Sequence, residues 1–140
     1  DQGRFTGFLC DTYAARRLGK QSTGSAGRRV GGPPSVSSTN FFLQPGEQTP
    51  EQLLADTPKA LYVRRMMGFG FNPVTGDFSK GAEGFWIEDG QRSHPVSEVT
   101  ISANFDELLR SIDAVADDLR HRSGTASPTF RVARMTVAGS

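Results

Sequence analysis

The sequence predicts an α+β fold with a largely antiparallel sheet, a glycine-rich β-meander and two to three helices. Two observations support this prediction. Segments with the composition and spacing of strands outnumber helical segments, and most of them are joined by short turns. The stretch 70–90 is also so dense in glycine that no helix would tolerate it, which is typical of strands connected by tight turns.

The N-terminal part begins with an aromatic run at 4–10, which predicts a strand. Asp11, or the threonine after it, then supplies the N-cap of a short helix over 13–18 that Gly19 ends. Residues 20–38 are rich in Gly, Pro and Ser and contain almost nothing to bury, so we predict one long loop there. A loop of this length is uncommon inside a compact domain and is usually functional or disordered.

The middle of the chain carries two strong local signals. Thr49 and Pro50 predict a helix start, because threonine caps helices and proline favours the first helical position. The dipeptide Asp89-Gly90 is typical of a tight turn between two strands. Strands are predicted around these two features at 39–43, 60–67, 69–72, 77–79, 84–88 and 97–102.

Two longer segments complete the predicted fold. Apolar residues over 105–119 recur at three- and four-residue spacing, which predicts one amphipathic helix with Asn104 as its N-cap. Residues 128–137 are predicted to form a final strand. We interpret residues 1–140 as a single compact lobe of a longer protein, because the chain begins with polar turn residues instead of methionine and fits the size of one domain.

Composition argues against several classes of partner. The chain has 16 basic and 15 acidic side chains and a net charge of +1. This near balance gives no electrostatic basis for expecting nucleic acid or an anionic membrane as a binding partner. No apolar run approaches the ~20 residues that a membrane-spanning helix needs. Cys10 is the only cysteine, which precludes an internal disulfide and fits a reducing compartment.

Asn72, Thr75 and Asp77 are candidates for lining a substrate cleft, since polar residues on loops held by a rigid sheet often bind ligands. The alternative is that they form turns and bond their own backbone. Arg28 is a further candidate, because a guanidinium can hold a carboxylate or phosphate through two hydrogen bonds. A solvated loop arginine is the alternative there.

The sequence predicts neither a metal site nor a catalytic nucleophile in this chain. Zinc needs three or four ligands, whereas His94 and His121 lie far apart and in different predicted elements. Cys10 ends an apolar run, where a buried, inert thiol is the usual state. The residues alone therefore describe a foldable lobe without a complete active site, and whether it belongs to an enzyme stays undecided.

Three motifs resemble one known family. They are 75–90 (Thr-Gly-Asp-Phe-Ser-Lys-Gly-Ala-Glu-Gly-Phe-Trp-Ile-Glu-Asp-Gly), 95–104 (Pro-Val-Ser-Glu-Val-Thr-Ile-Ser-Ala-Asn) and 135–139 (Met-Thr-Val-Ala-Gly). They are similar to the C-terminal portion of the TldD/PmbA proteins, also labelled modulators of DNA gyrase and regarded as zinc metallopeptidases.

The resemblance implies a position within that family. In its TldD-like branch, a His-Glu-x-x-x-His helix in an earlier part of the protein binds zinc, and a C-terminal cysteine completes the site. Residues 119–127, where that cysteine is expected, contain none. The Phe-Trp-Ile-Glu run at 85–88 likewise resembles the PmbA branch, also called TldE, whose members lack the metal site and pair with a TldD-like subunit.

The function implied by this resemblance is that of the C-terminal domain of a PmbA/TldE-like subunit. Such a subunit belongs to a cytoplasmic zinc metallopeptidase complex that degrades unfolded peptides. Zinc is then expected in the assembled complex or an upstream domain and not in this chain, and the partner is a TldD-like homologous subunit or a second copy. The alternatives are a self-sufficient homodimeric metallopeptidase with zinc bound upstream, and a non-proteolytic, gyrase-modulating protein-binding module.

Overall fold

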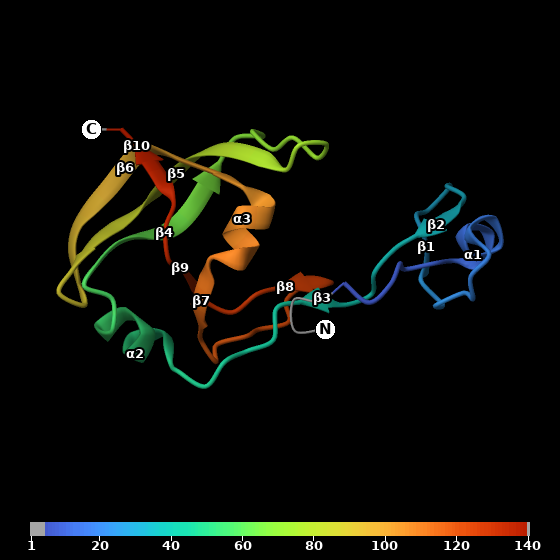
Figure 1. Ribbon diagram of the computed structural model, residues 1–140, viewed down its shortest axis with the longest axis horizontal. Helices are drawn as coiled ribbons and strands as arrows, with labels where there is room; N and C mark the ends of the chain where they lie inside the picture. The colour runs from blue at the N-terminus through green and yellow to red at the C-terminus, as the bar shows by residue number, and fades with distance from the viewer. Residues whose placement is uncertain (1–4, 140) are drawn as a thin grey trace. The chain divides into compact units, whose positions relative to one another are not determined.

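The structure, a computed structural model, describes residues 5–139 and divides them into two compact units. We call residues 5–43 with Arg120–Ala126 the N-terminal unit, and Gln44–Leu119 with 127–139 the sheet unit. The elements of both are labelled in Figure 1. Across the described residues, mostly antiparallel strands accompany three helices, which confirms the predicted α+β class.

The N-terminal unit contains the predicted first helix, α1 (Thr12–Leu18). The Asp11 side chain accepts a hydrogen bond from the Ala14 amide, and Gly19 ends the helix in the left-handed conformation at φ 61°. Both residues act as the sequence predicts, because a carboxylate satisfies a free amide at a helix start and glycine tolerates positive φ.

Short paired strands make up the rest of this unit. Within the 20–38 segment, β1 (Ala26–Arg28) and β2 (Pro34–Val36) form an antiparallel hairpin that the sequence analysis did not predict. β3 (Phe41–Phe42) pairs in parallel with β8 (Thr125–Ala126). Residues 5–10 pair with no strand, so the strand predicted over 4–10 is wrong in its described part. Aromatic residues favour strands, but a strand also needs a neighbouring strand to pair with, and residues 5–10 have none.

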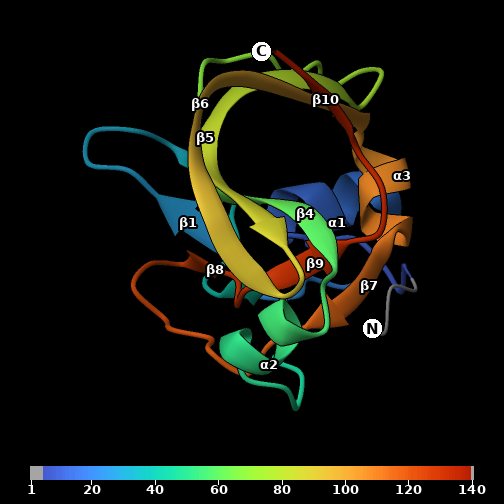
Figure 2. The same cartoon turned by 90° about the vertical axis from the view of Figure 1, so that its left-hand side faces the viewer.

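A four-stranded antiparallel sheet forms the framework of the sheet unit, in the order β10-β6-β5-β4. It is strongly curled, as Figure 2 shows. Its strands are β4 (Lys59–Met67), β5 (Asp77–Glu88), β6 (Gln91–Asn104) and β10 (Thr136–Ala138). Asp89 and Gly90, with φ of 49° and 75°, form the tight turn between β5 and β6, which confirms the turn prediction.

The sequence predicts that glycines interrupt the chain between residues 79 and 84. In the structure, the glycines of β5 do not interrupt the strand. The separate strands predicted at 77–79 and 84–88 are one continuous strand. Gly84 lies against the backbone of Tyr62 on β4, where a β-carbon would collide with the carbonyl oxygen. The glycine therefore permits close approach of two strands at an irregularity in their register. Of the strand predicted at 69–72, only an isolated bridge between Phe71 and Phe78 forms.

Two helices border the sheet. In α2 (Pro50–Ala55), the Thr49 side chain bonds the Gln52 amide and the Gln52 side chain bonds the Thr49 amide, so the predicted helix start is confirmed as a capping box. α3 (Phe105–Arg110) begins after Asn104 as predicted.

The prediction of a single helix over 105–119 is wrong beyond Arg110. Residues after it form β7 (Ile112–Val115), which pairs with β9 (Phe130–Val132). The predicted strand at 128–137 is correspondingly split between β9 and β10, which belong to different sheets. Pairing between β7 and β9 therefore overrides the helical spacing, in a segment whose β-branched Ile112 and Val115 suit a strand.

The core of the sheet unit lies on one face of the curled sheet. Ala82, Val99 and Ile101 are buried there, and they are packed against partly buried side chains of Leu61, Phe78, Val96 and Met135. No helix in the described part of the chain is long and apolar enough to cross a membrane.

Candidate functional site

The polar residues predicted as cleft candidates lie in and beside the loop between β4 and β5. The Asn72 side-chain oxygen accepts hydrogen bonds from the amides of Val74 at 2.9 Å and Thr75 at 3.4 Å. The Thr75 hydroxyl accepts from the amide of Asp77 at 3.3 Å. These contacts are those of turn formers that bond their own backbone, the alternative weighed for them above.

Asn104, at the end of β6, joins this loop to the sheet. Its side-chain NH2 donates to the Thr75 carbonyl and to the Asp77 carboxylate, both at 2.9 Å. Its side-chain oxygen accepts from the Asp106 amide at 3.0 Å and so caps α3. The hydrogen bond from Asn104, followed by that from Thr75, lowers the pKa of Asp77 below its ordinary value of 3.8. Sequence reasoning found the cap but missed this second role.

Three of the four candidates are neighbours, and the fourth belongs to the other unit. Asn72, Thr75 and Asp77 are exposed neighbours in the sheet unit, whereas Arg28 belongs to the hairpin of the N-terminal unit. The Arg28 Nε donates to the Gly32 carbonyl at 3.0 Å within that hairpin. A role of any of them in binding substrate stays a prediction.

The donor set of the chain does not fit a zinc site. Within residues 5–139, no group of three or more His, Cys, Asp or Glu side chains is arranged to hold a metal ion. Cys10 is buried, with 1% of its surface exposed, as predicted. His94 and His121 are both exposed, and the His121 ring packs edge-on against Phe42 at 5.0 Å between ring centroids. Zinc requires convergent ligands, and these donors do not converge.

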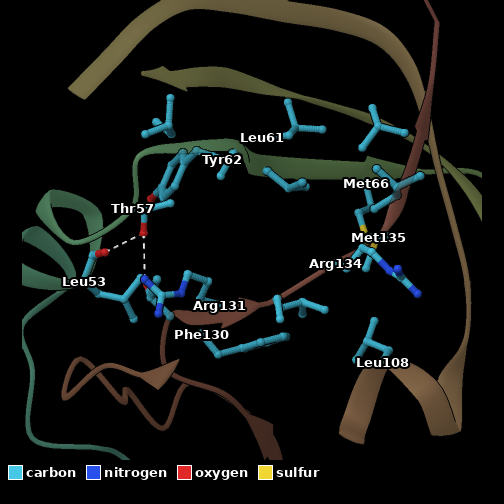
Figure 3. A pocket seen from close by; sticks show the side chains of 18 of the residues that line it. Leu53, Thr57, Leu61, Tyr62, Met66, Leu108, Phe130, Arg131, Arg134 and Met135 are labelled. Carbon is cyan, nitrogen blue, oxygen red and sulfur yellow. Dashed lines mark hydrogen bonds between the residues drawn. The ribbon is translucent and has the colours of Figure 1, made fainter. Parts of the chain in front are cut away.

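The sheet unit contains an apolar cavity of about 980 Å³ that is open to solvent on one side. Figure 3 shows β4 bordering it on one side with Leu61, Tyr62 and Met66, while the opposite side carries Phe130 and Leu108. Trp86, the only tryptophan in the sequence, also lines it. None of the three loop candidates lines this cavity, although the adjacent Phe71 and Phe78 do. Sequence reasoning missed the cavity, because it results from the curl of the sheet.

One end of the cavity is fixed by a polar cluster around Arg131. Its Nε donates to the Asp113 carboxylate at 2.9 Å, and its Nη1 donates to the Thr57 hydroxyl at 3.1 Å. Thr57 in turn donates to the Leu53 carbonyl in α2 at 2.7 Å (Figure 3). The guanidinium thus ties β9 to the end of α2 through its Nε and Nη1.

Comparison with known families identifies the fold. The family model described as the PmbA/TldA metallopeptidase C-terminal domain matches residues 1–139. The chain belongs to this PmbA/TldD family. The match covers nearly the whole sequence and confirms the resemblance carried by the motifs at 75–90 and 95–104.

Curated relatives agree with that assignment. The chain is 36% identical to the metalloprotease PmbA of Escherichia coli O157:H7 over 98% of its own length and 28% of that protein. It is 35% identical to the metalloprotease PmbA homologue of Haemophilus influenzae, over its full length and 29% of that protein. This PmbA/TldD domain therefore spans less than a third of the length of these relatives.

Solved structures of the family share the fold. One is a candidate modulator of a DNA gyrase from Thermotoga maritima, with a TM-score of 0.87 and 35% identity over 97% of this chain and 31% of that one. Another is TldE from Thermococcus kodakarensis, with a TM-score of 0.89 and 25% identity over 98% of this chain and 32% of that one.

Proposed function

We propose that this chain is the C-terminal, non-catalytic domain of a PmbA/TldE-like subunit in a cytoplasmic zinc metallopeptidase complex that degrades unfolded peptides. Its role is to enclose the peptide chamber and to contribute to contact with a TldD-like homologous subunit. Zinc and the water that it activates are supplied elsewhere in the assembly.

One observation carries the proposal: the chain matches a metallopeptidase family along its length, yet residues 119–127, where the resemblance places the cysteine ligand of the TldD-like branch, contain no cysteine. Without that ligand, the domain is expected to support binding and assembly. The similarity to a protein that is itself called TldE favours the branch proposed here.

The test is to purify, under gentle conditions and from its own cells, the protein that contains this chain. Zinc content, co-purifying proteins and cleavage of unfolded peptides are measured on the same sample. We expect a stoichiometric homologous partner that carries the zinc, and peptide cleavage that requires both proteins. Stoichiometric zinc and cleavage without any partner would contradict the proposal and favour the self-sufficient homodimeric metallopeptidase.

A second function is favoured by a different observation. The relative from Thermotoga maritima is described as a candidate modulator of a DNA gyrase, which suggests a protein-binding module without proteolysis. In that case the purified sample retains a protein partner under conditions in which no peptide is cut. Cleavage by the assembled sample excludes this function as the only one.

A further inference from the structure

We propose that the cavity of the sheet unit binds a peptide segment that carries both large apolar side chains and a carboxylate. This inference rests on the proposed role in a peptide-degrading complex and adds the chemical class of peptide that this domain selects.

The size of the cavity is the first argument. The cavity is open to solvent on one side, and its volume of about 980 Å³ lies within the range of ligand-binding clefts. Its apolar lining, which includes Leu61, Trp86 and Met135, favours apolar side chains as the occupants of most of that space.

The charge of the lining is the second argument. Lys59, Lys80, Arg131 and Arg134 line the cavity, whereas none of its described lining residues is Asp or Glu. Arg131 is neutralised by Asp113, and the Lys59 ammonium lies 5.5 Å from the centre of the Trp86 ring. Lys80 and Arg134 form no ion pair with any other described residue. Lys80 is half-buried and Arg134 is exposed at the cavity, and two cations there without an acidic partner favour an occupant that brings a carboxylate.

The position of Lys80 strengthens this point. In the β5–β6 register it lies directly opposite Ile101, which is 4% exposed and belongs to the core. Residues opposite each other in an antiparallel pair project from the same face, so the lysine stem rises from the apolar face of the sheet. The side chain is half-buried there, where a carboxylate would stabilise its charged head.

The edges of the sheet favour a polypeptide over a free amphiphile. β4 and β10 are the two end strands, and residues of both, including Val63 and Val137, line the cavity. An end strand presents backbone N–H and C=O groups on one side that an extended peptide can bond. A fatty acid would fill apolar volume but would make none of those backbone hydrogen bonds.

Trp86 makes binding measurable without cleavage. The emission of this single tryptophan is followed while the 140-residue chain is titrated with a blocked hexapeptide of four leucines and two central glutamates. We expect a saturable change for this peptide, binding about tenfold weaker when glutamine replaces glutamate, and no binding when lysine replaces it. Tenfold corresponds to the loss of one charge-assisted hydrogen bond. Equal affinities for the three peptides, or no saturable change with the glutamate peptide, would overturn the proposal.

The residues are tested with matched variants that each remove one positive charge. Lys80→Gln and Arg134→Gln are each expected to weaken binding of the glutamate peptide about tenfold. Arg110→Gln serves as the control, because Arg110 is exposed on α3, pairs with Asp106 and does not line the cavity. Circular dichroism confirms folding of each variant. An unchanged affinity in both folded cavity variants would overturn the assignment of the two cations.

Two further titrations distinguish a peptide from other possible occupants of the cavity. Decanoate is titrated in the same way. If decanoate gives a saturable change in Trp86 emission and no peptide does, the cavity binds free carboxylate amphiphiles and the proposal of a peptide occupant is overturned. The longer protein that contains this chain is also titrated, and loss of peptide binding there would mean that its own polypeptide fills the cavity. Neither result depends on zinc or on cleavage, so failure here is distinguishable from failure of the proposed function.

Discussion

The two units of this chain differ in the apolar side chains that they bury, although both expose others; in the sheet unit, Phe69 and Val74 are exposed. In the sheet unit, Ile87, Val99 and Ile101 are 1%, 5% and 4% exposed. Among the described residues of the N-terminal unit, the buried apolar side chains are those of Cys10 and Ala15. Apart from the half-buried Leu43, its large apolar side chains are exposed instead, and they are Phe5, Phe8, Leu9, Tyr13, Leu18, Val30, Val36, Phe41 and Phe42.

This difference indicates where each unit obtains its stability. Burying one large apolar side chain contributes about 1.5–3 kcal/mol, so the sheet unit has an internal source of stability. The N-terminal unit is held by local hydrogen bonds, such as that from the Cys10 amide to the Thr23 hydroxyl at 2.8 Å. An exposed apolar surface of this kind is typical of regions that contact another protein surface. We therefore expect the N-terminal unit to depend on a partner and the sheet unit to depend on its own core.

The largest expected effect comes from the core of the sheet unit. Ile87→Ala removes a side chain that is 1% exposed and should lower the free energy of unfolding by about 2–4 kcal/mol. Val30→Ala, at a fully exposed position of the N-terminal unit, is the control and should change it by less than about 0.5 kcal/mol. Urea unfolding followed by Trp86 fluorescence measures both, and similar losses would remove the contrast between the units.

A second contrast is between glycines. Gly84→Ala places a β-carbon against the Tyr62 carbonyl and should cost about 1–3 kcal/mol, because β4 must move away from β5. Gly7→Ala, in the N-terminal unit, meets nothing within 4 Å and should be close to neutral. Thermal unfolding of the two variants provides the comparison. A neutral Gly84→Ala would mean that the two strands are not held this closely.

The third prediction tests the dependence on a partner. Amides of the 20–38 segment should exchange faster in the free chain and become protected about tenfold or more, equivalent to 1.4 kcal/mol, in the assembled complex. Amides of β5 and β6 within the sheet serve as the internal control and should change little. Hydrogen exchange read by mass spectrometry measures both regions. Equal protection of 20–38 in the free and assembled states would contradict the expectation.

The smallest effect concerns the loop between β4 and β5, which is tied to its own unit by Asn104. Asn104→Ala should raise the pKa of Asp77 towards its ordinary value of 3.8, and Thr75→Ala should raise it less, because the Asn104 bond is the larger cause. A lowered carboxyl pKa stabilises the fold fully above the ordinary value, and this contribution is lost as the pH falls through the folded-state pKa. NMR titration of the Asp77 carboxyl is the measurement; an unchanged pKa in Asn104→Ala would refute the assigned cause.

Features that depend on a few neighbouring residues could be predicted from the amino-acid sequence alone. Asp11 and Gly19 bound α1, Thr49 and Gln52 cap α2, and Asp89-Gly90 forms the turn between β5 and β6. Caps and tight turns are decided by side chains that bond the backbone within four residues and by the φ angles that glycine permits. The family motifs are local in the same sense, since a contiguous run such as 75–90 carries them.

Tertiary structure decided whatever depends on a distant partner. The segment after Arg110 has helical spacing, yet it forms β7 because β9 offers a strand to pair with, and residues 5–10 remain without a strand because none does. Gly84 permits a close approach to Tyr62 that no local pattern reveals. The cavity with Lys80 and Arg134 likewise arises only when the sheet curls and brings β9 opposite β4 (Figure 3). Strand pairing and burial are contacts between residues far apart in sequence, and their free energy exceeds the small local preferences that a sequence pattern expresses.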